Sequence, residues 1–177
     1  LLVPARALTE LQRSAGSTNP EATVGVTLTD SEVCFVVGGT NIASRLIDGN
    51  YPSVMQLIPA SYPNQIRIAK DTLITSLRRA KLLANDTTSS VRLTVQDKSV
   101  EVRTASSDRG QIDDHVDADY SGEEITIAFN PNFLIDGIEA VNGDEVLLEI
   151  SDAVRPAMVR SVDDDSFRYL LMPVRVQ

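Results

Sequence analysis

The chain has 177 residues, a formal net charge of −9 at pH 7, one cysteine and one histidine. This length suits one full domain and part of another. The negative charge argues against nonspecific coating of nucleic acid by the whole surface, but it leaves room for a local basic stripe. A single cysteine and a single histidine exclude an internal disulfide and a structural zinc site, and no stretch reaches the ~18 apolar residues of a membrane span. We therefore expect no metal, no cofactor and no membrane partner.

The N-terminus does not have the pattern of a secretory signal, because the charged Arg6 closely follows Leu1, Leu2 and Val3. The sequence has no initiator methionine, so we expect it to be a fragment of a longer chain. The single cysteine fits a reducing compartment.

The apolar pattern predicts helices alternating with antiparallel strands. Helices are expected where apolar residues recur with a 3.6-residue period, and strands where apolar and polar residues alternate or β-branched residues form short runs. The expected helices cover residues 3–13, 70–84 and 131–141. The expected strands cover residues 23–28, 32–37, 40–47, 65–69, 91–95, 100–104, 111–119, 124–129, 146–150, 157–162 and 167–176.

The third expected helix has the clearest start. Asn130 is a favourable N-cap and Pro131 suits the first helical position. Its apolar residues are expected to lie on one face and are Phe133, Leu134, Ile138 and Val141.

One helix with three strands occurs three times, with a period of ~60 residues. Two units close alike, because residues 46–51 resemble residues 115–120. A strand joins the second and third units, so we expect them to share a sheet and form one α+β domain. The first unit lacks such a partner and would bury little apolar surface alone. The linker that separates them, residues 53–63, contains Pro59 and Pro63.

No pattern of catalytic residues stands out, since a Gly-rich phosphate loop, a nucleophile elbow and a histidine pair are absent. His115 fits a surface strand residue better than a catalytic base. Asp113 and Asp114 are adjacent on the same strand and point to opposite faces, which is poor geometry for acid–base catalysis. Residues 163–165 are acidic but lack the ligand spacing of a calcium loop, so we expect a solvated hairpin loop there. We expect no enzyme.

The first two helices are cationic and the third is acidic. A cationic helix face can contact phosphates without reading bases, but a merely solvated helix face fits the pattern equally well. The charged positions are Lys70, Arg78, Arg79 and Lys81 against Asp71 on the second helix, Arg6 and Arg13 against Glu10 on the first, and Asp136 and Glu139 on the third.

The chain ends in its most apolar run, residues 169–174. The simpler interpretation is a final core strand, but near a sheet edge Leu171, Met172 and Val174 would instead line an apolar groove. Pro173 cannot donate a backbone hydrogen bond, so the end of this strand must lie at an edge or leave the sheet.

The repeat of ~60 residues, the cationic first two helices and the apolar C-terminal run together make the chain resemble the bacterial DNA polymerase III beta subunits, the replicative sliding clamps. The resemblance covers the whole chain and implies the DNA-clamp fold, with two helix-plus-three-strand units per domain. Residues 1–58 would be the second half of the middle domain, and residues 59–177 the third domain. Two full-length chains would close head to tail around duplex DNA in the bacterial cytoplasm, at the nucleoid. The most specific motifs are Val3-Pro4, residues 46–52, Tyr120-Ser-Gly122, Ala128-Phe-Asn130 and residues 169–175.

The resemblance also implies a pocket that takes short linear motifs from DNA polymerases, clamp-loader subunits and repair proteins. An extended peptide would bury leucine and aromatic side chains against Leu171, Met172 and Val174, which reverses the simpler interpretation of the terminal run. Gln56 and Thr88 replace the Arg and Phe that other members can carry. The expected wall consists of Pro52, Gln56, Leu57, Thr88, Asn130, Phe133, Val154, Pro156, Leu170, Leu171, Met172, Pro173, Val174 and Arg175.

Two further surfaces follow from the resemblance. Arg6 and Arg79 match positions expected to face DNA, and Arg78 and Lys81 are expected to assist, through weak phosphate contacts that permit sliding. Leu82 and Leu83 are expected at the subunit interface, with burial of the helix end inside its own domain as the alternative for Leu82. The implied mechanism is tethering without a cofactor.

The rival interpretation is a non-catalytic, β-rich structural or adhesion module whose repeats only build a scaffold. It predicts that a charged residue in place of Met172 harms stability alone. The clamp interpretation predicts loss of peptide binding with the fold retained.

Overall fold

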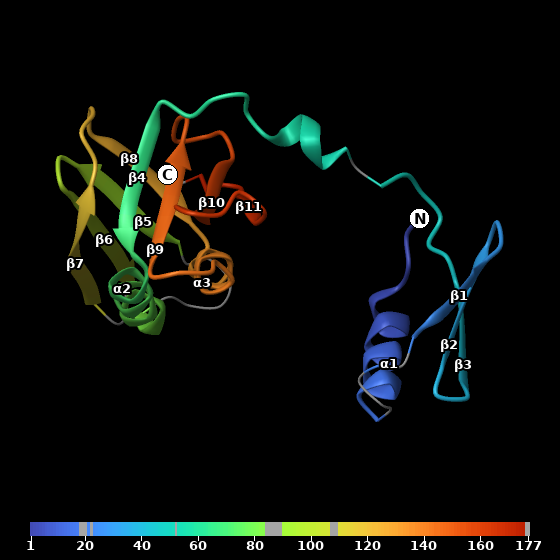
Figure 1. Ribbon diagram of the computed structural model, residues 1–177. Helices are drawn as coiled ribbons and strands as arrows, with labels where there is room; N and C mark the ends of the chain where they lie inside the picture. The colour runs from blue at the N-terminus through green and yellow to red at the C-terminus, as the bar shows by residue number, and fades with distance from the viewer. Residues whose placement is uncertain (18–20, 22, 52, 84–89, 107–109, 176–177) are drawn as a thin grey trace. The chain divides into compact units, whose positions relative to one another are not determined.

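The computed structural model describes residues 1–17, 21, 23–51, 53–83, 90–106 and 110–175 (Figure 1). The chain divides into two compact units, Leu1–Val54 and Met55–Gln177. This division falls before residue 58, where the sequence analysis placed the end of the first part. A short 3-10 helix, η1 (Val54–Leu57), lies at the division, within the linker for which no secondary structure was expected.

The first unit is a helix with a three-stranded antiparallel sheet. The helix α1 (Ala5–Gly16) is followed by β1 (Gly25–Leu28), β2 (Glu32–Val37) and β3 (Thr40–Arg45), in the sheet order β1-β2-β3. Between β2 and β3, Gly38 and Gly39 have φ values of 54° and 81°, which is the conformation that a two-residue hairpin turn requires. The element order matches the expectation, although α1 continues beyond Arg13.

The strand β1 was expected to be half-buried, but all of its residues are exposed. On β2 the alternate residues Val33 and Phe35 are buried, and α1 packs against β2 and β3. The strand β1 is an edge strand that pairs only with β2 within the described residues. Its apolar side chains, including Val26 and Leu28, therefore lie at the surface of this unit.

The second unit contains one eight-stranded sheet, with the strand order β11-β10-β9-β4-β7-β6-β5-β8. The helices α2 and α3 pack against each other, side by side (Figure 1). The elements are β4 (Asn64–Ala69), α2 (Lys70–Leu83), β5 (Val91–Gln96), β6 (Ser99–Ser106), β7 (Gly110–Asp119), β8 (Ile125–Phe129), α3 (Pro131–Glu139), β9 (Glu145–Ile150), β10 (Ala157–Ser161) and β11 (Arg168–Leu171).

The two repeats of this unit exchange strands. The strand β4 leads into α2, but it pairs along its length with β9 of the following repeat. The strand β8 leads into α3, but it pairs with β5 of the preceding repeat. The shared sheet that the sequence predicted thus arises from reciprocal pairing, in which each repeat supplies a strand to the other.

The core lies between the helices and the inward faces of the strands. Phe133 was expected on the same face of α3 as Leu134, but it is 55% exposed whereas Leu134 is buried. Consecutive helical residues are turned by about 100°, so Phe133 cannot share the direction of the fully buried Leu134. The buried helical side chains are Leu73, Ile74, Leu77, Ala80, Leu134, Ile135 and Ile138.

Two tyrosine rings lie directly over glycines. A Cβ atom at Gly137 in α3 would lie within 3.0 Å of three ring atoms of Tyr169 on β11, so glycine permits this approach of strand to helix. A Cβ atom at Gly122 would overlap the hydroxyl end of Tyr120. The Tyr120 hydroxyl donates to Asn64 Oδ1 at 2.7 Å, which joins the turn after β7 to the start of β4.

The last strand is shorter than expected, because β11 ends at Leu171 and not near residue 176. Pro173 interrupts the ladder, and the chain leaves the sheet at its edge, as the proline predicted. Beyond the proline, the backbone N–H of Val174 donates to the carbonyl oxygen of Ala128 at 2.7 Å. The chain end thereby connects β11 to β8, the opposite edge strand of the same sheet.

Candidate functional site

A hollow of about 370 Å³ lies beside the C-terminal segment. Four parts of the second unit form it: β5, β8, the loop between β9 and β10, and the chain beyond Pro173. Apolar side chains supply much of the wall, and two arginines are the charged members. The lining residues are Arg92, Thr126, Ile127, Ala128, Ala153, Val154, Val174 and Arg175.

The hydrogen bond from Val174 to Ala128 fixes one side of this hollow. The strand β8 has an open edge because, among the residues that the structure describes, it pairs only with β5. An edge strand presents unpaired backbone groups, and the terminal segment satisfies one of them here. Val174 and Arg175 are therefore held against β8.

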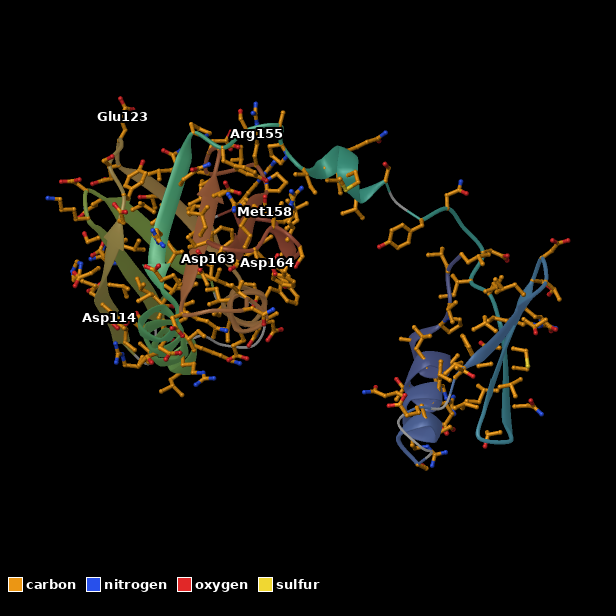
Figure 2. All side chains as sticks on the ribbon, viewed as in Figure 1. Asp114, Glu123, Arg155, Met158, Asp163 and Asp164 are labelled. Atoms are coloured by element: carbon orange, nitrogen blue, oxygen red, sulfur yellow. The ribbon has the colours of Figure 1, made fainter. Side chains whose placement is uncertain are left out.

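A turn at Asp152 fixes the opposite side of the hollow. Asp152 Oδ1 accepts hydrogen bonds from the backbone N–H groups of Val154 at 2.9 Å and Arg155 at 2.8 Å. These two donors stabilise the charged carboxylate and lower the pKa of Asp152. Figure 2 labels Arg155, whose guanidinium Nε lies 3.2 Å from Asp152 Oδ2. The turn presents Val154, which is 63% exposed.

The residues expected in the peptide pocket have different environments. Val154, Val174 and Arg175 line the hollow, and Met172 is an exposed neighbour of this segment at 62%. Leu171 packs in the core and is only 4% exposed, because alternate residues of an extended chain point to opposite faces. The expectation that the Leu171 side chain lines the wall of the peptide pocket is therefore wrong.

The remaining expected pocket residues lie around the same region of the second unit or on η1. Asn130 accepts a hydrogen bond from the backbone N–H of Asn132 at 2.9 Å and caps α3, as predicted. Phe133 is exposed on that helix. The other positions are half-buried Leu170, Pro173 and Pro156, exposed Gln56 and Leu57 on η1, and Pro52 and Thr88, which lie outside the described residues.

Sequence reasoning missed the part of the hollow that β5 and β8 form. Arg92 lies on β5 directly opposite Ala128 on β8, and Thr126 follows on the same face. The outward position of Arg92 was visible in the alternation of its strand, since its neighbours Val91 and Leu93 are apolar and buried. The pairing of β5 with β8 was not visible, because strand register over this distance depends on the whole sheet.

The cations of α2 are largely engaged within the chain. Arg78 pairs with Glu139 of α3 at 2.7 Å, and Arg79 pairs with Asp114 of β7. Figure 2 labels Asp114 beside α2. Its hydrogen bond with Arg79 is the main cause of its lowered pKa. Lys81 is exposed and has no ion-pair partner within the described residues.

Asp113 and Asp114 point to opposite sides of β7, as the sequence predicted. Asp113 pairs with Arg103 of the neighbouring strand β6, whereas Asp114 contacts the helix α2. The hydrogen bond from Arg103 also lowers the pKa of Asp113. The two carboxylates therefore serve separate ion pairs.

The end of α2 exposes an apolar side chain, and the helix packs on a strand with a partly open edge. Leu82 is 75% exposed, so the alternative of burial inside its own domain is wrong, and Leu83 is half-buried. The helix packs on β7, which pairs with β4 only at Ala118 and Asp119. Within the described part of the chain, the rest of that edge of β7 has no strand partner.

The acidic loop near residue 164 is held by its own hydrogen bonds. Asp164 (labelled in Figure 2) accepts from the backbone N–H of Ser166 at 2.8 Å, and Asp165 pairs with Arg160 at 3.1 Å. The described residues contain no cluster of three or more His, Cys, Asp or Glu side chains arranged to hold a metal. None of the described helices is both long and apolar enough to cross a membrane.

Two family models match the chain. The model for the DNA polymerase III beta subunit, C-terminal domain, matches residues 55–175, and the model for its central domain matches residues 1–53. The Beta sliding clamp of Staphylococcus aureus is 30% identical over 177 residues, which cover 99% of this chain and 46% of that protein. The Staphylococcus epidermidis protein is 29% identical with the same coverage. The chain spans about half the length of the curated relatives it matches.

Solved structures agree with the family match. The chain is similar to Caulobacter crescentus pol III beta, with a TM-score of 0.90 and 27% identity, over 98% of this chain and 46% of that one. It is also similar to the sliding clamp (DNA polymerase III subunit beta) from Bartonella birtlesii bound to griselimycin, with a TM-score of 0.89 and 28% identity over the same fractions. The repeated helix-and-strand architecture is thus the fold of these clamps.

Proposed function

Because this chain belongs to the DNA polymerase III beta subunit family, we propose that it is part of a DNA sliding clamp, a processivity factor that encircles duplex DNA and tethers polymerases. The chain spans 46% of its S. aureus relative, so the ring requires the remaining parts of a longer chain and a second copy arranged head to tail. Its role is non-catalytic, because holding polymerase and DNA together raises their effective concentration. It acts in the bacterial cytoplasm, at the nucleoid.

The observation that carries this proposal is the apolar surface at the chain end. Val154 and Val174 are exposed and line the hollow, and Met172 is exposed in the same terminal segment as Val174. Exposed apolar side chains around a concavity are typical of a site for a partner's side chains. An extended segment of a polymerase or clamp-loader subunit would bury leucine and aromatic side chains there. Phe133, Leu170, Gln56 and Leu57 complete the proposed wall.

We place the DNA contacts on Arg6 and Lys81, with Arg78 and Arg79 in support. Arg6 and Lys81 are exposed and have no ion-pair partner within the described residues, so phosphates can approach them directly. To contact DNA, Arg78 must leave the carboxylate of Glu139 and Arg79 that of Asp114, and each must pair with a phosphate instead. Weak, sequence-independent contacts of this kind suit a protein that slides.

We place the subunit interface at Leu82 and Leu83 together with the open edge of β7. The exposed Leu82 supplies apolar area, and the unpaired edge supplies backbone donors and acceptors for a strand of the second copy. This interface requires parts of the full-length protein that lie outside this sequence.

The test is peptide binding by the Met172→Glu variant. We expect the affinity for a fluorescent peptide with two leucines and a phenylalanine to fall at least tenfold, a change of about 1.4 kcal/mol. The free energy of unfolding should change by less than about 0.5 kcal/mol, because the side chain is exposed. The control is Val26→Glu, which adds the same charge at an exposed apolar position in the first unit.

The rival interpretation, a plain scaffold module, is not favoured, because both family models describe domains of the DNA polymerase III beta subunit. It predicts that Met172→Glu lowers stability and that the unaltered chain binds no such peptide. Unfolding of the Met172→Glu variant, or equal peptide binding by both variants, would contradict the clamp proposal.

A further inference from the structure

Two arginines line the hollow at the chain end, and none of the described residues that line it is acidic. The whole chain has 25 acidic and 16 basic residues, so a concavity with only positive charge runs against its overall balance. Arg92 comes from β5 and Arg175 from the terminal segment, so two separate parts of the chain bring this charge together.

Neither arginine is neutralised by an acidic residue in the described part of the chain. Within the described residues, Arg92 and Arg175 form no ion pair, whereas arginines elsewhere do so repeatedly. The paired arginines are Arg13, Arg67, Arg78, Arg79, Arg103, Arg155 and Arg160. A guanidinium carries five N–H donors in a planar fork, and those of Arg92 and Arg175 are available to an incoming acceptor.

The pairing of β5 with β8 holds Arg92 in the lining of the hollow. Its neighbours Val91 and Leu93 are buried, which fixes the side chain of Arg92 on the opposite, outer face of β5. The residue directly across the ladder is Ala128, whose small side chain leaves space beside the guanidinium stem. Thr126 lies on the same face of β8, with its hydroxyl 3.2 Å from that of Thr94.

We propose that the peptide groove continues from the terminal segment onto the outer face of β5 and β8, where Arg92 and Arg175 bind an acidic side chain that flanks the apolar part of the peptide. This inference rests on the proposed peptide-binding function. Ala153, Val154 and Val174 line the hollow with the two cations and are exposed, which favours an amphipathic peptide over a nucleic-acid backbone. A carboxylate between two guanidinium groups forms charge-assisted hydrogen bonds, and Arg92 is half-buried, which limits screening by water.

The experiment compares two synthetic nine-residue peptides by fluorescence anisotropy. Both contain the same two leucines and phenylalanine, and they carry either aspartates or asparagines on both sides of this apolar part. We expect the unaltered chain to bind the aspartate peptide about fivefold more tightly, as for a partly exposed ion pair. Arg92→Gln should remove most of this preference, so that the two peptides bind with nearly equal affinity. Arg92→Lys should retain part of it, because the charge remains.

The matched control is Arg168→Gln, which removes the same charge from an exposed position that lines a different hollow. This variant should keep the full preference for the aspartate peptide. Rising salt should reduce the preference of the unaltered chain but not the affinity of the Arg92→Gln variant for the asparagine peptide. If Arg92→Gln proves unfolded by circular dichroism, the comparison rests on Arg92→Lys and the salt series.

The outcomes separate the two proposals. Failure of both peptides to bind would overturn the peptide-binding function itself. Equal affinity for both peptides, unaffected by Arg92→Gln, would leave peptide binding intact and overturn the acidic subsite. Displacement of the aspartate peptide by duplex DNA in the unaltered chain, but not in Arg92→Gln, would assign the two arginines to phosphates and also overturn it.

Discussion

The contact between Gly137 and Tyr169 joins the chain end to the helix α3, and substituting the glycine tests it. In Gly137→Ala, the new Cβ atom would lie within 3.0 Å of three ring atoms of Tyr169. These are ring atoms close to the strand, so a small movement of a flexible tip cannot relieve the overlap. The ring must shift and move β11, whose end leads into the terminal segment.

Two opposing effects set the magnitude. Alanine in place of glycine inside a helix gains about 0.5–1 kcal/mol. Overpacking of a well-packed contact costs about 1–3 kcal/mol. The free energy of unfolding should therefore fall by about 1 kcal/mol in Gly137→Ala. In a Tyr169→Ala background the overlap is gone, so the same substitution should stabilise by up to about 1 kcal/mol. The sign reversal corresponds to a coupling energy of about 2 kcal/mol.

Urea denaturation of the four chains of this double-mutant cycle measures the coupling. Gly16→Ala is the control, since a Cβ atom at Gly16 has no neighbour within 4 Å, and it should not lower stability. If Gly137→Ala stabilises the chain with Tyr169 present, or has equal effects in both backgrounds, then the close approach of ring and helix does not limit this position.

Three further changes test the site and its support. Asn130→Ala removes the cap of α3 and should lower the free energy of unfolding by about 1 kcal/mol in urea denaturation; no change would mean that the cap is dispensable. Asp152→Ala should weaken peptide binding in the anisotropy assay, because the turn beside the hollow loses the acceptor for two backbone N–H groups. Asp152→Asn keeps one acceptor oxygen and should bind nearly normally. Equal binding by the two variants would refute this role of Asp152. The hydrogen bond with Arg79 is the main reason that the folded-state pKa of Asp114 lies below the ordinary value of 3.8. The ionised Asp114 therefore stabilises the fold above about pH 4, and this stabilisation is lost as pH falls through the folded-state pKa. Urea denaturation between pH 7 and pH 3 should show this loss, with a shallower pH dependence in Asp114→Asn; an unchanged slope would contradict it.

Local signals predicted most of the fold. The cap at Asn130, the apolar face of α2 and the neighbouring strands expected at 91–95 and 100–104 depend on residues close together in the sequence. The shared sheet also followed from the repeat. The exposure of β1 and the early end of β11 were missed, because they depend on which elements cover or extend a strand.

The candidate site was predicted in part, through resemblance and not through periodicity. Val154, Val174 and Arg175 were expected in a pocket wall, and they line the same hollow. Leu171 was assigned to that wall although its alternation with Met172 turns it into the core. Arg92 was missed because its place depends on the pairing of β5 with β8, which no local pattern encodes.

The reciprocal exchange of strands also sets the order in which this domain can fold during synthesis. The strand β4 pairs with β9, and the side-chain amide of Asn64 donates to the carbonyl oxygen of Ile150, 86 residues later. At about 5–20 residues per second, the ribosome needs on the order of ten seconds to deliver that partner. Through this interval α2 and the hairpin of β5 and β6 can form, because their contacts are local, but β4 lacks the partner along its length and can pair only with the last two residues of β7. A nascent chain that stalls before Ile150 therefore carries an open strand edge.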